Sequence, residues 1–234
     1  MFTIRIAGLN IQIDNKYPYL ESFCKDYVVV SEEIPDLSVA VTDVEIEQER
    51  RGADTRVSLG YAESICVYRR ICEALPTRFN AFLFHSAVID YKGRGYAFSA
   101  KSGTGKSTHI SLWKRAFGDD VAIVNGDKPI VRYIGGRFVA YGTPWCGKEG
   151  WQRNSSAELC AICFLERGET NSIRKLDASD AVSLVFGQIL VPKDLEGFDA
   201  ISGLLDAMLS SVPCYLLRCN MDTEAAFVAR DGMN

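Results

Sequence analysis

The feature that most constrains the fold is a short glycine loop, Ser99-Ala-Lys-Ser-Gly-Thr-Gly-Lys-Ser-Thr108. Residues 96–100 are apolar enough for a buried strand, and residues 106–117 have the spacing of an amphipathic helix that stops near Gly118. With 19 glycines in 234 residues, a Gly-x-Gly pair alone carries little information. Its position between a strand and a helix is what predicts a phosphate-binding loop.

Each residue type in this loop suits a phosphate group. Glycine permits backbone angles at which successive N–H groups converge on phosphate oxygens, and the helix N-terminus adds partial positive charge. The Lys106 ammonium has the reach for β- and γ-phosphates, and the Ser107 hydroxyl is the expected Mg²⁺ ligand. The predicted nucleotide contacts are Ser102, Gly103, Thr104, Gly105, Lys106, Ser107 and Thr108. One departure is Ala100, where the P-loop pattern begins with glycine; the alternative is a loop that only reverses the chain.

The sequence pattern of residues 79–234 predicts an α/β domain. Strands are predicted at 82–90, 96–100, 121–124, 159–165 and 215–217, and a hairpin at 130–134 and 137–141 around Gly135-Gly136. Helices are predicted at 178–190, at 201–210 and from 222 onward.

Residues 1–78 have a different pattern. Strands at 2–6, 11–13, 27–30 and 37–41 precede a helix at 59–75 that Pro76 is expected to close. This pattern predicts a small β-rich α+β module with no catalytic cluster of its own. A length of 234 residues fits one domain of ordinary size with a smaller one attached.

Two polar side chains are expected beside the glycine loop. Asp127 follows the strand at 121–124, at the carboxyl end where ligands of open α/β sheets bind. His85 lies inside the predicted strand 82–90, bordering the phosphate site, where a histidine suits a proton carrier or a phosphate contact. The alternative for His85 is a hydrogen-bonded core histidine.

A second glycine-rich loop covers residues 142–150. Its glycines favour a mobile segment whose Lys148 ammonium reaches a phosphate, while Trp145 or Trp151 offers a stacking surface. Arg153 is a weaker candidate for the same phosphate contact. The alternative is an exposed connector.

The sequence resembles a known family over roughly residues 80 to 150. Ser-Gly-Thr-Gly-Lys-Ser, preceded by Phe84-His-Ser-Ala-Val-Ile-Asp90 and followed by Ile123-Val-Asn-Gly-Asp-Lys-Pro-Ile130, is similar to the catalytic domain of HPr kinase/phosphorylase and its small relatives. It is more distantly similar to the nucleotide domain of phosphoenolpyruvate carboxykinase. The resemblance implies a P-loop kinase domain of this type with ATP and Mg²⁺ as cofactors.

The resemblance also assigns roles to residues. The family carries a pair of aspartates after the strand, and here Gly126 stands at the first position, Asp127 at the second and Lys128 at the basic position after them. Catalytic roles therefore fall to Asp127, His85 and Lys106, and metal binding to Ser107 and Asp127. With one acid missing, Asp127 either holds the metal or accepts the proton of the attacking hydroxyl, and His85 is a substitute for the other task.

The function expected from these features is transfer of the γ-phosphoryl group of Mg-ATP to a hydroxyl. The resemblance suggests a serine on a small protein or peptide and a homo-oligomer; a small hydroxyl compound is a further acceptor class. A non-catalytic module that senses a nucleotide is the rival, favoured by Ala100 and the missing acid.

The net charge of -4 excludes a strongly electropositive nucleic-acid binder. No apolar run approaches the roughly 18 residues of a membrane span and no secretory signal is evident, so a cytoplasmic location is expected.

Overall fold

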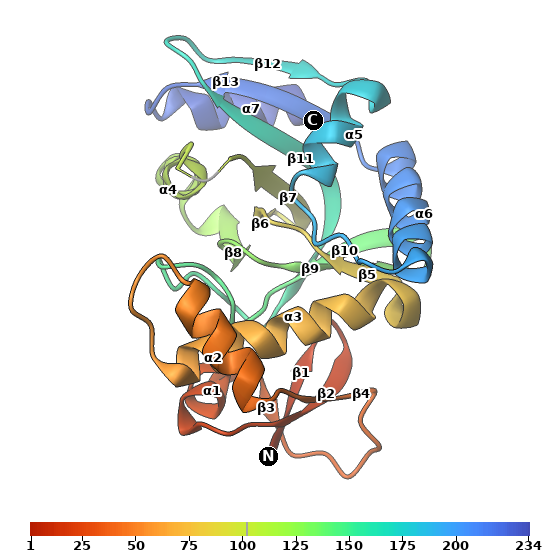
Figure 1. The fold of residues 1–234 in the computed structure, drawn as a ribbon. Coiled ribbons are helices and arrows are strands. Elements are labelled where there is room, and N and C mark those ends of the chain that lie inside the picture. The colour runs from red at the N-terminus through yellow and green to blue at the C-terminus, as the bar shows by residue number, and fades with distance from the viewer. Residues whose placement is uncertain (102) are drawn as a thin grey trace.

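The computed structural model describes residues 1–101 and 103–234. The N-terminal part is a four-stranded sheet in the order β3-β1-β2-β4 with helices packed on it (Figure 1). Its elements are β1 (Phe2–Ile6), β2 (Leu9–Asp14), α1 (Pro18–Phe23), a 3₁₀ turn (Lys25–Tyr27), β3 (Val28–Val29), β4 (Leu37–Ala40), α2 (Asp43–Gly52) and α3 (Leu59–Phe79).

Helix α3 confirms the predicted helix but runs past its expected end. Pro76 lies inside the helix and is buried, and the chain leaves α3 at Asn80, which has a left-handed backbone with φ of 50°. A proline normally interrupts a helix because it lacks the N–H and its ring crowds the preceding turn. Here the buried neighbour Leu75 belongs to the N-terminal core, and this packing keeps the last turn helical.

Helix α2 was not predicted, although its start is visible in the sequence. Thr42 accepts a hydrogen bond from the Glu45 N–H at 3.2 Å, and the Glu45 carboxylate accepts one from the Thr42 N–H at 2.8 Å. This reciprocal capping box defines the first turn. The helix buries only Ile46, so the apolar periodicity that reveals longer helices is nearly absent.

The larger sheet has nine strands and makes the fold mixed α/β. Its path is β5-β9-β10-β11-β7-β6-β8, with β13 beside β11 and β12 beside β13. The strands are β5 (Ala81–Leu83), β6 (Ala87–Tyr91), β7 (Arg94–Ser99), β8 (Val121–Asn125), β9 (Ile130–Ile134), β10 (Arg137–Tyr141), β11 (Ser156–Arg167), β12 (Ser172–Lys175) and β13 (Cys214–Cys219). Strands β7, β11 and β13 run parallel, so their carboxyl ends share one edge. The predicted hairpin is confirmed as β9 and β10.

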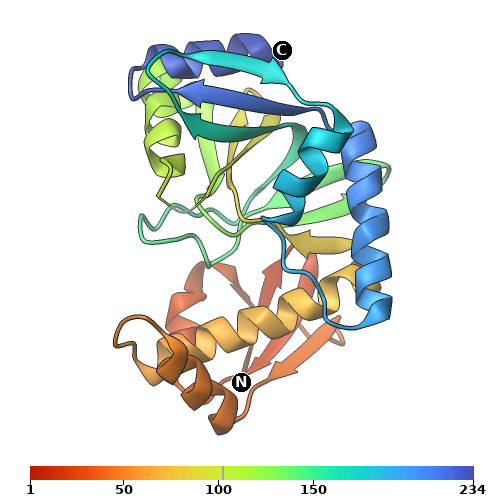
Figure 2. The same ribbon diagram turned by 45° about the horizontal axis from the view of Figure 1, so that its top comes forward.

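Helices cover both faces of this sheet (Figure 2). On one face α4 (Lys106–Phe117) and α7 (Glu224–Met233) bury a core that includes Trp113. On the other, α5 (Ala178–Phe186) and α6 (Leu195–Ser211) bury a second core that includes Met208. Helix α5 ends before the predicted residue 190, and α6 begins before the predicted residue 201. Within residues 1–101 and 103–234, we find no helix with the length and hydrophobicity to cross a bilayer.

The N-terminal part packs on the larger sheet through α3, which lies between the two (Figures 1 and 2). Trp145 stacks on Tyr68 with ring centroids 4.1 Å apart and donates a hydrogen bond to the Ser64 carbonyl at 3.0 Å. Arg132 of β9 donates to the Ala7 carbonyl at 2.9 Å. These contacts fix α3 against the segment that carries the candidate site.

Candidate functional site

The glycine loop joins the carboxyl end of β7 to the N-terminus of α4, as the sequence predicts. Gly103 and Gly105 have φ of 77° and 124°, values that side chains rarely tolerate. Ser102 was predicted to contact the nucleotide and lies outside the described residues. Thr104 and Ser107 are half-buried, while Thr108 is exposed on the first turn of α4. No side chain caps the start of α4 among the described residues, and the first N–H groups of a helix have no partner within the helix itself.

The predicted strand 82–90 is two strands, and His85 lies at the break between them. The backbone of this break is satisfied by distant loops rather than by a strand partner. The Phe84 N–H donates to the Pro129 carbonyl at 3.2 Å and the Ser86 N–H to the Asp127 carbonyl at 3.0 Å. The His85 N–H donates to the Gln188 carbonyl at 2.7 Å. His85 is therefore half-exposed at the edge of the sheet, and the prediction that it lies inside a strand is wrong.

Three predicted catalytic residues converge in space. Lys106 Nζ lies 3.0 Å from His85 Nε2 and 3.8 Å from Asp127 Oδ1, and His85 Nε2 lies 3.1 Å from Asp127 Oδ1. The lysine is the most buried of the three, with 11% of its side chain exposed, against 31% for the histidine and 24% for the aspartate. Residues far apart in the chain thus form one cluster beside the glycine loop.

The hydrogen-bond partners of His85 indicate which of its two ring nitrogens carries a proton. Nδ1 lies 2.9 Å from Gln188 Oε1, an acceptor, so Nδ1 carries a proton and donates. Nε2 then either accepts from the Lys106 ammonium or, when protonated, donates to Asp127. The cluster can therefore pass a proton between the imidazole and the carboxylate without moving a heavy atom.

Electrostatics in the cluster favour an ionised aspartate. Burial acts to raise the pKa of Asp127, but the hydrogen bond from His85 and the charges of Lys128 and Lys106 outweigh it and lower the pKa. Burial lowers the pKa of Lys106, and the carboxylates of Asp127 and Glu149 oppose that effect. A further anion, such as a phosphate, would favour the charged ammonium in the same way.

Asn125, which was not predicted as a site residue, holds Asp127 in place. Its buried amide oxygen accepts hydrogen bonds from the N–H groups of Asp127 at 2.9 Å and Lys128 at 2.7 Å. Its amide nitrogen donates to the Thr143 carbonyl at 3.0 Å. The signal in the sequence is an asparagine at the strand end followed by glycine and aspartate, which is a typical Asx turn.

Gly126 shows why the first acid of the expected pair is missing. A Cβ atom at this position would lie 2.9 Å from the Cys146 carbonyl oxygen and 3.3 Å from both the Cβ and the carbonyl oxygen of Trp151. The glycine is buried under the 142–150 loop, so an aspartate side chain has no room here. The loop takes the space that a second carboxylate would need.

The 142–150 loop carries a carboxylate of its own, Glu149. A Cβ atom at Gly147, where φ is 81°, would lie 3.1 Å from the Asp127 Cβ and 3.5 Å from Glu149 Oε2. The two acids therefore flank the same glycine. Glu149 was not predicted, because the basic and aromatic residues of the loop are the types that suggest contact with a nucleotide. Lys148 is exposed and forms no hydrogen bond or ion pair with another described residue. Trp145 is buried against Tyr68, so it offers no stacking surface, whereas Trp151 is half-buried and stays a prediction.

A cavity of about 490 Å³, here called the loop-side cavity, opens beside the glycine loop. Its walls are residues 103–105 and the α4 side chains of Thr108, His109 and Leu112, together with the carboxyl ends of β11 and β13. Arg167, at the end of β11, donates to the Gly103 carbonyl at 2.7 Å. Arg167 was not predicted from the sequence, because its place beside the loop depends on β11 pairing with β7.

The oxygen ligands near the loop suit a metal that arrives with a phosphate. Within the described part of the chain, no group of three or more His, Cys, Asp or Glu side chains is placed to hold a metal ion. Mg²⁺ is commonly held by one or two carboxylates together with phosphate oxygens and water. Asp127, Glu149 and the Ser107 hydroxyl are oxygen donors of this kind and are the residues that could hold such an ion.

A mixed α/β fold with a glycine loop and a Lys-His-Asp cluster is the class that the structure defines. Residues 55–189 match the family described as SynChlorMet cassette protein ScmC, and the chain belongs to this family, whose description names no activity. No curated protein matches the chain. Among solved structures it resembles the HPr(Ser) kinase/phosphatase from Coxiella burnetii at 11% identity, covering 64% of this chain and 94% of that one. The TM-score of 0.37 makes this a weak likeness.

Proposed function

We propose that the protein is a kinase that transfers the γ-phosphoryl group of Mg-ATP to a hydroxyl. The observation that carries the proposal is the position of Lys106, which follows the glycine loop directly and lies within 4 Å of both His85 and Asp127. A phosphate bound at the N-terminus of α4 would meet the lysine on one side, and its transferable group would meet the carboxylate and the imidazole.

The nucleotide would bind with its phosphates on the glycine loop and its base and ribose in the loop-side cavity. A volume of about 490 Å³ lies in the usual range of about 300–1,000 Å³ for small-molecule sites. The Leu112 and Leu165 side chains supply apolar wall for a base, and Arg167 supplies a cation beside the phosphate loop. With Asp127 as the proton acceptor, Ser107 and Glu149 are the residues that would hold Mg²⁺, which would offset the charge of the phosphates.

In the transfer step the acceptor oxygen forms a bond to the γ-phosphorus, the bond from that phosphorus to the β–γ bridging oxygen breaks, and ADP leaves. The hydroxyl proton goes to Asp127, whose lowered pKa makes it ionised at neutral pH. His85 orients that carboxylate through its Nε2 and can carry the proton onward. Lys106 offsets the charge that gathers on the phosphoryl oxygens.

The assay is label transfer from Mg-ATP to a panel of serine peptides and small hydroxyl compounds. Transfer that is lost in Lys106→Ala and reduced in Asp127→Asn supports the proposal. Comparing Asp127→Asn with His85→Ala then shows which group accepts the proton, because loss of the base lowers kcat more than loss of the orienting group. Transfer that survives Lys106→Ala would contradict the site.

A non-catalytic nucleotide sensor is the second candidate, favoured by the packing at Gly126 that excludes the first acid of the pair. The same assay separates the two. A sensor binds ATP with an affinity that Lys106→Ala weakens, and it transfers label to none of the acceptors. A kinase transfers label to at least one class of acceptor.

A further inference from the structure

A second cavity shares His85 with the cluster but contains no residue of the glycine loop in its wall. This α3-side cavity has a volume of about 260 Å³. Its lining comes from α3, from β5 and the break after it, from Lys128, and from the segment 187–190. A group bound here would therefore contact His85 without contacting the glycine loop.

The walls of the α3-side cavity are apolar with a cationic rim. Ile65, Leu83 and Ile189 are half-buried and form much of the lining. The charged residues that line it are Arg69 and Lys128, and no acidic residue of the described chain does so. Lys128 forms no ion pair with a described carboxylate. Such a site accepts an uncharged apolar group and repels a basic one.

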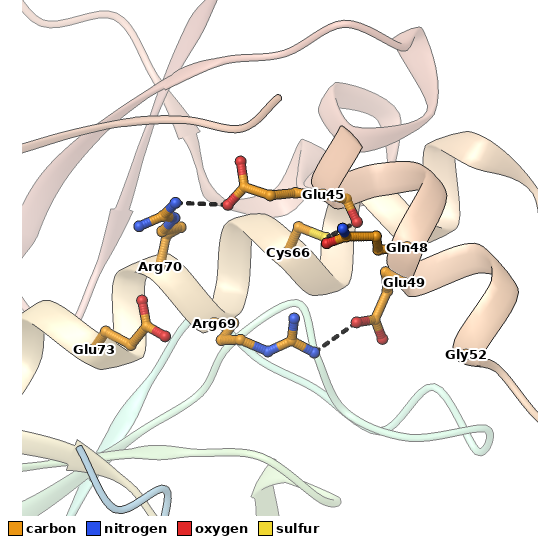
Figure 3. A pocket seen from close by; sticks show the side chains of 8 residues that line it. All are labelled: Glu45, Gln48, Glu49, Gly52, Cys66, Arg69, Arg70 and Glu73. Atoms are coloured by element: carbon orange, nitrogen blue, oxygen red, sulfur yellow. Dashed lines mark hydrogen bonds and ion pairs between the residues drawn. The ribbon is translucent and has the colours of Figure 1, made fainter. Parts of the chain in front are cut away.

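The size of this cavity limits what it can hold. At about 260 Å³ it is smaller than the usual site for a whole ligand, about 300–1,000 Å³, and suits a single large side chain. Arg69 also lines a third, polar hollow of about 390 Å³ between α2 and α3 (Figure 3). In that hollow Arg69 pairs with Glu49 and Arg70 with Glu45, each at 2.6 Å. Only an extended molecule can occupy the apolar cavity and continue past Arg69 into the hollow.

We propose that the α3-side cavity is the acceptor site and that its occupant is a peptide, with a serine at His85 and Asp127 and an apolar neighbouring residue in the cavity. The inference rests on the proposed kinase function and gives the N-terminal helix α3 its role in recognition. The serine oxygen gains the phosphoryl group and its proton passes to Asp127, with ADP as the leaving group.

The first test compares two acceptor peptides under Mg-ATP, acetyl-Gly-Leu-Ser-Leu-Gly-amide and the version with lysine in place of both leucines. We expect kcat/KM for the leucine peptide to be about tenfold higher or more, since one apolar group in a fitted pocket discriminates by that order. Ile65→Asp should abolish most of this preference and leave ATP affinity unchanged. The control is Ile134→Asp, on the β9–β10 hairpin outside the cavity, which should keep the preference.

Equal use of both peptides, a preference that survives Ile65→Asp, or better transfer to free serine or glycerol than to either peptide would overturn the peptide site. A second measurement needs no catalysis. The leucine peptide with benzoylphenylalanine beside the serine is photo-crosslinked to the full chain, and the adducts are mapped by mass spectrometry. Adducts on α3 or on residues 187–190 support the site, and adducts elsewhere overturn it. Adducts at the site in a protein that binds no ATP would sink the kinase function while supporting the peptide site.

Discussion

The two cavities, one beside the glycine loop and one beside His85, are built in different ways. The loop-side cavity takes much of its wall from one continuous stretch, the glycine loop and the first turns of α4. The α3-side cavity takes its wall from four segments that are far apart in the sequence. Phosphate binding by backbone N–H groups needs only local structure, whereas a pocket for an acceptor depends on how α3 is docked against the sheet.

The largest expected effect comes from Lys106, which follows the glycine loop directly and lies beside His85 and Asp127. Lys106→Ala should lower kcat/KM by about 10³-fold, equivalent to about 4 kcal/mol, because it removes the cation that offsets charge on the transferred group. The measurement is steady-state label transfer to the leucine peptide. Lys175→Ala is the control, since Lys175 is exposed on β12 and distant from the loop in the fold. Equal losses in both variants would show that the effect is not specific to the cluster.

Replacing the missing acid tests whether the 142–150 loop has closed that position. Gly126→Asp should not raise activity and should destabilise the fold by about 3 kcal/mol, because the new Cβ meets backbone 2.9 Å away and the carboxylate is buried. Urea unfolding measures the change. Gly203→Asp, at an exposed helical position with open space, should change stability by about 0.5 kcal/mol or less. A gain of activity in Gly126→Asp would contradict the packing explanation.

His109, which lines the loop-side cavity, should make the free energy of unfolding depend on pH. Burial lowers the pKa of His109 to about 3, while an unfolded histidine titrates near about 6.5. Between these values the unfolded chain binds the extra proton, so stability is full above about pH 6.5 and falls as the pH is lowered.

At pH 5 the loss should be about 2 kcal/mol relative to neutral pH, measured by urea unfolding. His109→Gln should remove this part of the pH dependence. The chain has 2 histidines, so His85→Ala is a matched control that should retain it. An unchanged pH profile in His109→Gln would show that another group is responsible.

The smallest expected effect is on ATP affinity, and it should show that the two cavities bind different ligands. Arg167→Ala removes the hydrogen bond to the Gly103 carbonyl and a cation from the loop-side cavity, and should weaken ATP binding about fivefold, or about 1 kcal/mol. The leucine peptide preference should not change. Arg174→Ala on β12, where the arginine is exposed and pairs with Asp180, should leave ATP affinity unaltered by calorimetry. An altered peptide preference in Arg167→Ala would mean that the cavities are coupled.

Elements with strong local signals were predicted well. The helix 106–117 matches α4 residue for residue, and the Gly135-Gly136 turn places β9 and β10 correctly. The predictions failed where contacts with distant parts of the chain determine the local secondary structure. Residues 82–90 look like one apolar strand, but the backbone at 84–86 bonds to Pro129, Asp127 and Gln188 and splits it. Pro76 would end an isolated helix and is instead held inside α3 by its burial.

By itself the sequence determined the glycine loop, the helix behind it and the presence of Lys106, His85 and Asp127, because strand, turn and helix signals act over a few residues. Only the tertiary structure decided which contacts these three side chains make with one another, that Glu149 flanks Asp127 while Gly126 is closed, and that Arg167 reaches the loop. It also decided that α3 forms the wall of a second cavity. Such contacts join residues tens of positions apart, and their free energy comes from packing that no local periodicity encodes.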